Sequence, residues 1–100
     1  MDRYVIFINN STDYLMFPLR AFIGARYASS ESIDLFFEKA PLSYKITISV
    51  HIGTGIIAAY KIAELFSRNT NTVITFDDTK REHPIEEIRL IDSFTKVVIK

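Results

Sequence analysis

The chain has 100 residues, of which 48% are hydrophobic, and this suffices for one domain with one hydrophobic core. Twelve basic residues balance twelve acidic residues, so no net charge attracts the chain to nucleic acid or to an anionic membrane. No cysteine is present, which excludes disulfides, thiolate metal ligands and a cysteine nucleophile. No linker, repeat or low-complexity tract interrupts the sequence, and we expect a single α+β domain over residues 1–100.

The first expected element is a strand at residues 4–8, where five apolar residues follow one another. A run of this length is too short for a membrane span or for the apolar part of a signal peptide. We therefore expect no membrane association, no secretion by a signal peptide, and a location in the cytoplasm or in a particle assembled there. The polar residues 9–13 are expected to form the turn that ends this strand.

Three further strands are expected to follow as an antiparallel meander. Apolar and β-branched residues mark them at residues 20–28, 33–38 and 44–52. The connections between them are short, whereas a parallel return needs about a dozen residues or more. Neighbouring strands of this meander must therefore run in opposite directions.

One principal helix is expected at about residues 55–69. Thr54 is suited to the N-cap, because its hydroxyl can accept a backbone N–H of the first turn. Apolar residues repeat with helical spacing, and small alanines allow a close approach to a sheet. We expect one stripe to be buried, and it consists of Ile56, Ala59, Tyr60, Ala63, Phe66 and, at its margin, Ile62.

The last third of the chain is expected to return to strands. Residues 72–76 are mostly β-branched, and residues 77–80 have the composition of a turn. Residues 85–91 fit either a helix or a strand. We favour the strand, with a beginning near Ile88, a turn at Asp92-Ser93 and a last strand at residues 95–100.

Together these elements predict an α+β fold, in which a mainly antiparallel sheet of five or six strands carries the helix on one face. Such a sheet is roughly 25 Å wide, since strands lie about 4.8 Å apart, whereas one helix is about 10 Å across. Residues 4–8 and 35–37 are apolar on both faces of their strands. Apolar surface must therefore be hidden either by curling of the sheet or by a second copy on its open face.

We favour the second copy. The expected function is that of a non-enzymatic assembly or interaction protein, which forms homo-oligomers through the open sheet face. The sequence contains no G-x-S-x-G motif and no other spacing typical of a catalytic group. We therefore expect no catalytic residues and no cofactor.

The alternative function is binding of an anion or small ligand in the loop before the helix. Gly53, Thr54 and Gly55 lie where free N–H groups at a helix N-terminus attract anions, and His51 is close by in sequence. The loop matches neither G-x-G-x-x-G nor a P-loop. A tight turn explains the same glycines, and we favour this structural explanation.

Asp77 is the fifth candidate ligand-binding residue, since carboxylates that follow a strand often bind metal ions or form acid–base pairs. Adjacent aspartates also form turns, and we favour the turn. A metal site that joins His51, Asp77 and His83 is conceivable, but neither histidine has a partner at metal-binding spacing. We therefore expect no metal.

Nucleic-acid binding is the third and weakest hypothesis. Arg20, Phe22 and Arg26 are expected on one side of a strand, where basic and aromatic side chains together bind single strands. The zero net charge and the acidic Asp34 on the next strand oppose this function. We expect a cross-strand ion pair between Arg26 and Asp34 instead, and no nucleic-acid partner.

Several features occur in a recognisable order along most of the chain. They are an opening strand that ends in Asn, the pair Phe17-Pro18, a Ser/Thr-rich hairpin at residues 29–33, an Ala-rich helix around residues 58–63, and a strand that ends in Phe76-Asp77-Asp78. This order resembles that of small uncharacterised proteins encoded by marine bacteriophages and marine bacteria. The resemblance implies a short accessory or particle-associated product, and it brings no catalytic residues.

Overall fold

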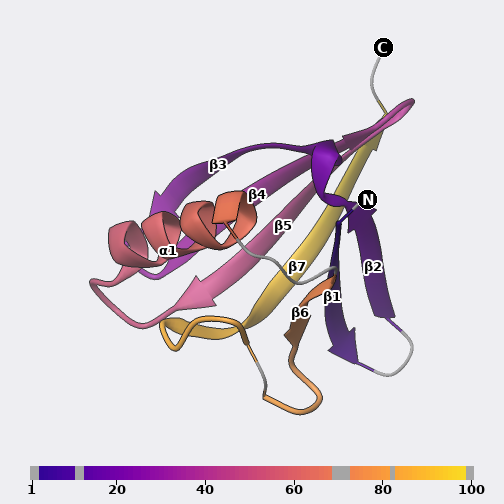
Figure 1. The fold of residues 1–100 in the computed structure, drawn as a ribbon. Helices are drawn as coiled ribbons and strands as arrows, with labels where there is room; N and C mark the ends of the chain where they lie inside the picture. The colour runs from indigo at the N-terminus through magenta and orange to yellow at the C-terminus, as the bar shows by residue number, and fades with distance from the viewer. Residues whose placement is uncertain (1–2, 11–12, 69–72, 82, 99–100) are drawn as a thin grey trace.

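The computed structural model describes residues 3–10, 13–68, 73–81 and 83–98, and these form two β-sheets and one α-helix (Figure 1). In chain order the elements are β1 (Tyr4–Asn10), β2 (Asp13–Pro18), the 3₁₀ turn η1 (Leu19–Ala21), β3 (Phe22–Ser29), β4 (Ser32–Lys39), β5 (Leu42–Val50), α1 (Gly55–Arg68), β6 (Val73–Asp77) and β7 (Ile88–Val98). The predicted α+β class, with one helix and mainly antiparallel strands, is confirmed.

The larger sheet has four antiparallel strands in the order β3-β4-β5-β7. Its first three strands are the predicted meander. Arg26 of β3 faces Asp34 of β4, and the guanidinium Nη2 donates to the Asp34 carboxylate over 2.8 Å. The predicted cross-strand ion pair is therefore confirmed, and Thr47 of β5 donates a second hydrogen bond to the same carboxylate over 2.8 Å.

The smaller sheet has three strands in the order β2-β1-β6, in which β1 runs antiparallel to β2 and parallel to β6. The single sheet that we expected is thus divided in two. The sequence prediction missed β2, because its apolar residues 14–17 form one short run without alternation, although only Phe17 of the six residues is buried. The predicted turn at residues 9–13 is shorter than expected, since β1 extends to Asn10 and β2 begins at Asp13.

The core lies on one face of the four-stranded sheet. Figure 1 shows α1 in front of β3 and β4, and the smaller sheet beside the helix, near β7. Together they cover the face from which β4 and β5 direct their apolar side chains. The buried residues come from both sheets and from α1: Val5, Phe7, Phe17, Ile33, Leu35, Phe37, Ile46, Ile48, Val50, Ala58, Ile62, Phe66, Ile74, Phe76, Ile88 and Ile91.

The opposite face of the larger sheet is polar. On β4 it carries Asp34 and Glu38 around the half-buried Phe36, and on β5 it carries Lys45 and Thr47. The Arg26 guanidinium lies 5.7 Å from the centre of the Phe36 ring. All eight phenylalanines are buried or half-buried. The expectation of a bare apolar sheet face is therefore wrong, because the smaller sheet covers the apolar area that one helix cannot reach.

Two bulges change which side chains share a face. Between Phe22 and Gly24 the register of β3 shifts, so Phe22 packs toward the core while Arg26 lies on the polar face. Arg20 belongs to η1 and not to the strand. The predicted basic and aromatic face of Arg20, Phe22 and Arg26 therefore does not form.

A second irregularity falls on β7, which is one continuous strand from Ile88 to Val98. The predicted turn at Asp92-Ser93 is wrong. Ser93 pairs with Thr47 and Ile91 pairs with Ile48, so Asp92 is an extra residue that bulges out of the ladder. The predicted beginning of a strand near Ile88 is confirmed.

Candidate functional site

Four of the five predicted ligand-binding residues lie where β5 leads into α1: His51, Gly53 and Thr54 belong to the connecting loop, and Gly55 is the first residue of the helix. Part of the hydrogen-bonding capacity of this loop is used within the chain. The N–H of Gly53 donates to the carbonyl of Ser30 over 3.2 Å, and the N–H of Thr54 donates to the carbonyl of His51 over 3.1 Å. Two donors on which an anion site in this loop would depend are therefore engaged.

Thr54 directly precedes α1, as predicted for an N-cap, and its carbonyl accepts the N–H of Ala58 over 2.8 Å. Its hydroxyl donates to the carbonyl of His51 over 2.6 Å. This bond closes the turn that leads into the helix. The side chain of Thr54 thus has a local structural partner.

Gly53 and Gly55 are each explained by a different structural requirement. Gly53 has φ = +79°, in the left-handed region where a side chain is disfavoured. Gly55 has no such backbone, but a Cβ there would lie 2.5 Å from Cε2 of Tyr27. Gly55 therefore permits the close approach of α1 to β3, and the favoured structural explanation of both glycines agrees with their geometry.

Gly53→Ala is expected to lower the free energy of unfolding by about 1–2 kcal/mol, because the left-handed backbone costs roughly this much for a residue with a Cβ. No atom lies within 4 Å of the position a Cβ would take, so steric contact adds nothing. Urea denaturation measures the change. Gly53→Asn should recover part of the loss, since asparagine tolerates this region, and an unchanged stability of Gly53→Ala would contradict this explanation.

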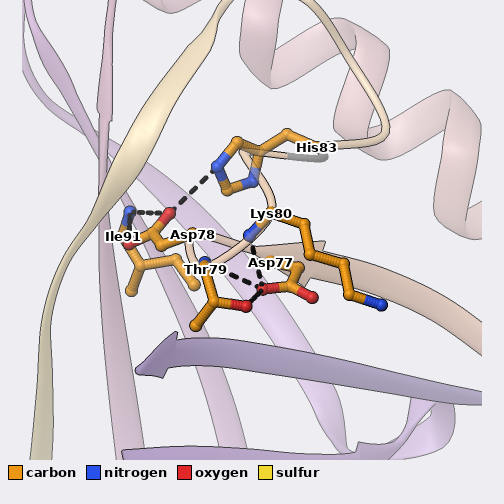
Figure 2. A network of polar contacts seen from close by, with 6 residues as sticks. All are labelled: Asp77, Asp78, Thr79, Lys80, His83 and Ile91. Atoms are coloured by element: carbon orange, nitrogen blue, oxygen red, sulfur yellow. Dashed lines mark hydrogen bonds and ion pairs between the residues drawn. The ribbon is translucent and has the colours of Figure 1, made fainter. Parts of the chain in front are cut away.

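Asp77, the fifth predicted residue, ends β6 and organises the turn that follows (Figure 2). Its Oδ1 accepts hydrogen bonds from the N–H of Thr79 (2.9 Å), the hydroxyl of Thr79 (2.6 Å) and the N–H of Lys80 (3.4 Å). The predicted turn is confirmed. The Thr79 hydroxyl above all, together with these N–H groups and the Lys80 charge, lowers the pKa of Asp77 against an opposing effect of burial.

Asp77→Ala is expected to destabilise the protein at pH 7 by more than the same change at the exposed Asp92. Because the pKa of Asp77 is lowered in the folded state, its contribution is present above the ordinary aspartate pKa of about 3.9 and is lost as the pH falls through the folded value. The difference between Asp77→Ala and wild type should therefore shrink toward acid pH. Urea denaturation from pH 7 to pH 3 measures it, and a difference that stays constant would contradict the assignment.

The neighbouring Asp78 joins three parts of the chain (Figure 2). Its N–H donates to the carbonyl of Ile8 over 2.9 Å, and its two carboxylate oxygens accept the N–H of Ile91 over 3.1 and 2.9 Å. Its Oδ1 also lies 2.9 Å from Nε2 of His83, whose side chain is only 6% exposed. Asp78 and His83 lie five positions apart in the chain, and no sequence motif joins them.

His83 is a buried side chain with unmet hydrogen-bonding capacity. Its Nε2 lies at ion-pair distance from the Asp78 carboxylate. Within the described part of the chain, neither ring nitrogen has a hydrogen-bond partner. Buried polar groups are nearly always paired in folded proteins, so this imidazole is exceptional.

A pocket of about 490 Å³ opens beside this pair. Its lining comes from the loop after β5, from the turn after β6 and from the beginning of β7, and it consists of His51, Asp78, Arg81, His83, Ile88, Arg89 and Leu90. The structure thus brings His51 and His83 to one pocket, with Asp78 and not Asp77 beside them. No three histidine, aspartate or glutamate side chains among the described residues form a group that suits a metal ion.

The second candidate site is an apolar surface on α1 and the edge strand β3. The buried side of α1 is formed by Ala58, Ile62 and Phe66, whereas Ile56 is 64% exposed and Tyr60 is 71% exposed. The predicted buried stripe is therefore confirmed for Ile62 and Phe66, and it is wrong for Ile56, Tyr60 and Ala63, which are exposed. The helix is rotated about its axis relative to the prediction, so that Ala58 faces the core and Ala59 is only half-buried.

The exposed stripe lies next to Tyr27 of β3, which is 51% exposed. Together they form a shallow groove of about 270 Å³, which is lined by Tyr27, Ile56, Ala59, Tyr60 and Ala63. We call these five residues the α1–β3 surface. Three more exposed apolar side chains lie on the same elements or in the adjoining loop, namely Ile23, Ile52 and Ile57.

In the described ranges no helix is both long and apolar enough to cross a membrane. Comparisons of this chain with protein-family models, with curated proteins and with solved structures give no match.

Proposed function

We propose that this chain is a non-enzymatic assembly or interaction protein that forms homo-oligomers, and that the α1–β3 surface is the contact between copies. The observation that carries the proposal is the pair of exposed apolar side chains of Ile56 and Tyr60 on α1, beside the exposed ring of Tyr27. Contiguous apolar patches of this kind mark interaction sites on folded proteins. Tyrosine is also among the residues that contribute most to binding at interfaces.

The available area suits a contact between two copies. Six apolar side chains on or beside this surface are 51–74% exposed: Ile23, Tyr27, Ile52, Ile56, Ile57 and Tyr60. If each contributes on the order of 100 Å², one copy presents about 600 Å² and a pair buries about 1,200 Å², which is the lower end of stable protein interfaces.

The edge of the larger sheet supports the same contact. β3 is the terminal strand of the order β3-β4-β5-β7, so its outer edge pairs with no described strand. Natural proteins protect such edges with charged residues, but the only charged residue of β3 is Arg26, which Asp34 engages. An antiparallel β3 from a second copy can extend the sheet there while the two helices cover each other's exposed stripes.

On the resemblance to small phage and bacterial products, we extend this proposal to an accessory or particle-associated role. Self-association suits such a role, because assembled particles are built from repeated contacts between identical chains.

Sedimentation equilibrium tests the proposal. Between about 10 and 300 μM, a range in which interfaces of this size associate, the average mass should rise toward twice the 11.5 kDa of one chain. A mass that stays at 11.5 kDa over the whole range would exclude homo-oligomers of this kind.

A further inference from the structure

We infer that the pocket beside Asp78 and His83 binds a small organic phosphate. This pocket shares no residue with the α1–β3 surface, so the inference does not depend on self-association. Its volume of about 490 Å³ falls within the range of about 300–1,000 Å³ that is typical of small-molecule sites. The pocket also differs from the predicted loop site, with which it has only His51 in common.

The charges of the lining favour an anion. Arg81 and Arg89 contribute two fixed positive charges, and the imidazole rings of His51 and His83 line the same pocket. Against these stands Asp78, whose carboxylate is already held by the N–H of Ile91. Glu87 lies outside the lining: its Oε2 is paired with Lys61 over 2.7 Å, and its Oε1 is buried without a hydrogen-bond partner among the described residues.

The buried imidazole of His83 is a second, independent observation that points to a ligand in this pocket. Its side chain is 94% buried, it lines the pocket, and within the described residues neither ring nitrogen has a hydrogen-bond partner. A ligand oxygen in the pocket would supply the partner that such a buried group requires. Oδ1 of Asp78 lies 2.9 Å from Nε2 on one side of the ring, as Figure 2 shows.

Arg81 stands at a position that the turn itself does not favour for an arginine. It has φ = +53°, a conformation that glycine or asparagine adopts at lower cost. The exposed guanidinium groups of Arg81 and Arg89 come from the turn after β6 and from β7. Two guanidinium groups at one pocket match the several oxygens and double charge of a phosphate monoester better than the single charge of a carboxylate.

The remaining wall is apolar. Ile88 is buried and Leu90 is 41% exposed, and both line the pocket next to the charged groups. An apolar wall beside a charged one suits a ligand with an organic part attached to its phosphate. We therefore expect phenyl phosphate to bind more tightly than inorganic phosphate.

The test is a titration with phenyl phosphate at pH 7.5, followed by amide and imidazole NMR shifts and by calorimetry. Wild type should show saturable binding, with shifts at the His83 ring nitrogens and in residues 88–91. Arg81→Gln and Arg89→Gln, both exposed and thus expected to fold, should each weaken binding about tenfold or more. Lys39→Gln removes the same charge from an exposed hairpin outside the pocket and should leave affinity within about twofold.

Three results would overturn the inference. They are an absence of saturation at about 10 mM phenyl phosphate, an equal loss of affinity in Lys39→Gln and the two arginine variants, and binding of benzoate or inorganic phosphate as tight as that of phenyl phosphate. Sedimentation of the arginine variants should match wild type, which keeps a failure here distinct from a failure of the self-association proposal.

Discussion

Phe37→Ala is expected to lower the free energy of unfolding by about 3–5 kcal/mol, the usual cost of removing a buried phenylalanine ring. Phe37 is fully buried on β4, at the meeting point of both sheets. Its ring stacks on Phe17 at 4.5 Å and contacts Phe7 at 5.6 Å and Phe22 at 5.4 Å. These neighbours are themselves held by other elements, so they cannot collapse into the space that the ring leaves.

The matched control is Phe36→Ala, the adjacent phenylalanine on the polar face of the same strand. Phe36 is half-buried and contacts the Arg26 guanidinium at 5.7 Å, so its removal should cost about 1–2 kcal/mol. For a domain of this size, the change at Phe37 corresponds to a fall in melting temperature of roughly 12–40 °C. Thermal and urea denaturation measure both variants, and equal losses would contradict the assignment of the two faces of β4.

Tyr60→Glu is expected to raise the dissociation constant of the homo-oligomer at least about thirtyfold, since a buried tyrosine at the centre of an interface contributes about 2 kcal/mol or more. Tyr60 is 71% exposed in the single chain and lines the α1–β3 groove with Tyr27 and Ile56. A carboxylate in its place would have to be buried without a partner, which adds to the lost contact.

The control for this prediction is Tyr14→Glu. Tyr14 is also a tyrosine and is 60% exposed, but it lies on β2 in the smaller sheet. It should leave the dissociation constant within about threefold, because β2 is not part of the proposed contact. Sedimentation velocity of both variants and wild type measures the effect. A larger loss of association in Tyr14→Glu would move the interface to the other sheet.

Local patterns in the sequence were sufficient to predict the structure wherever one strong rule applied. The meander followed from short connections, the turn at Asp77 from its residue types, and the Arg26–Asp34 pair from cross-strand register. Each of these features depends on residues that are close in sequence. They could therefore be predicted without knowledge of the remaining fold.

The orientation of α1 could not be predicted in this way. Its residues are apolar on several sides, with Ile57 and Ala58 beside Ile56 and with Leu65 beside Phe66. Helical periodicity then fits more than one buried stripe. The close approach of Tyr27 to Gly55 and the packing of Ile62 in the core decide the orientation, and both depend on residues from other elements.

Bulges and long-range strand pairing account for the other differences between the predicted and the observed fold. One extra residue at a bulge reverses which side chains share a face, as between Phe22 and Arg26, and sequence alternation alone does not reveal it. The parallel pairing of β1 with β6 joins segments about 70 residues apart. The pocket at Asp78 and His83 depends on this pairing. A role for its arginines, Arg81 and Arg89, could therefore not be predicted from the sequence.

The central claim is that copies of this chain meet at the α1–β3 surface. Distances between spin labels on two copies test this claim most directly. The natural chain has no cysteine, so Ser67→Cys on α1 and Thr95→Cys on the polar face of β7 can each be labelled at one site. Electron double resonance should give an intermolecular distance for the Ser67→Cys label that is shorter than the 35 Å long axis of one chain, and a longer distance for the Thr95→Cys label. No intermolecular coupling, or a shorter distance for the Thr95→Cys label, would contradict the claim.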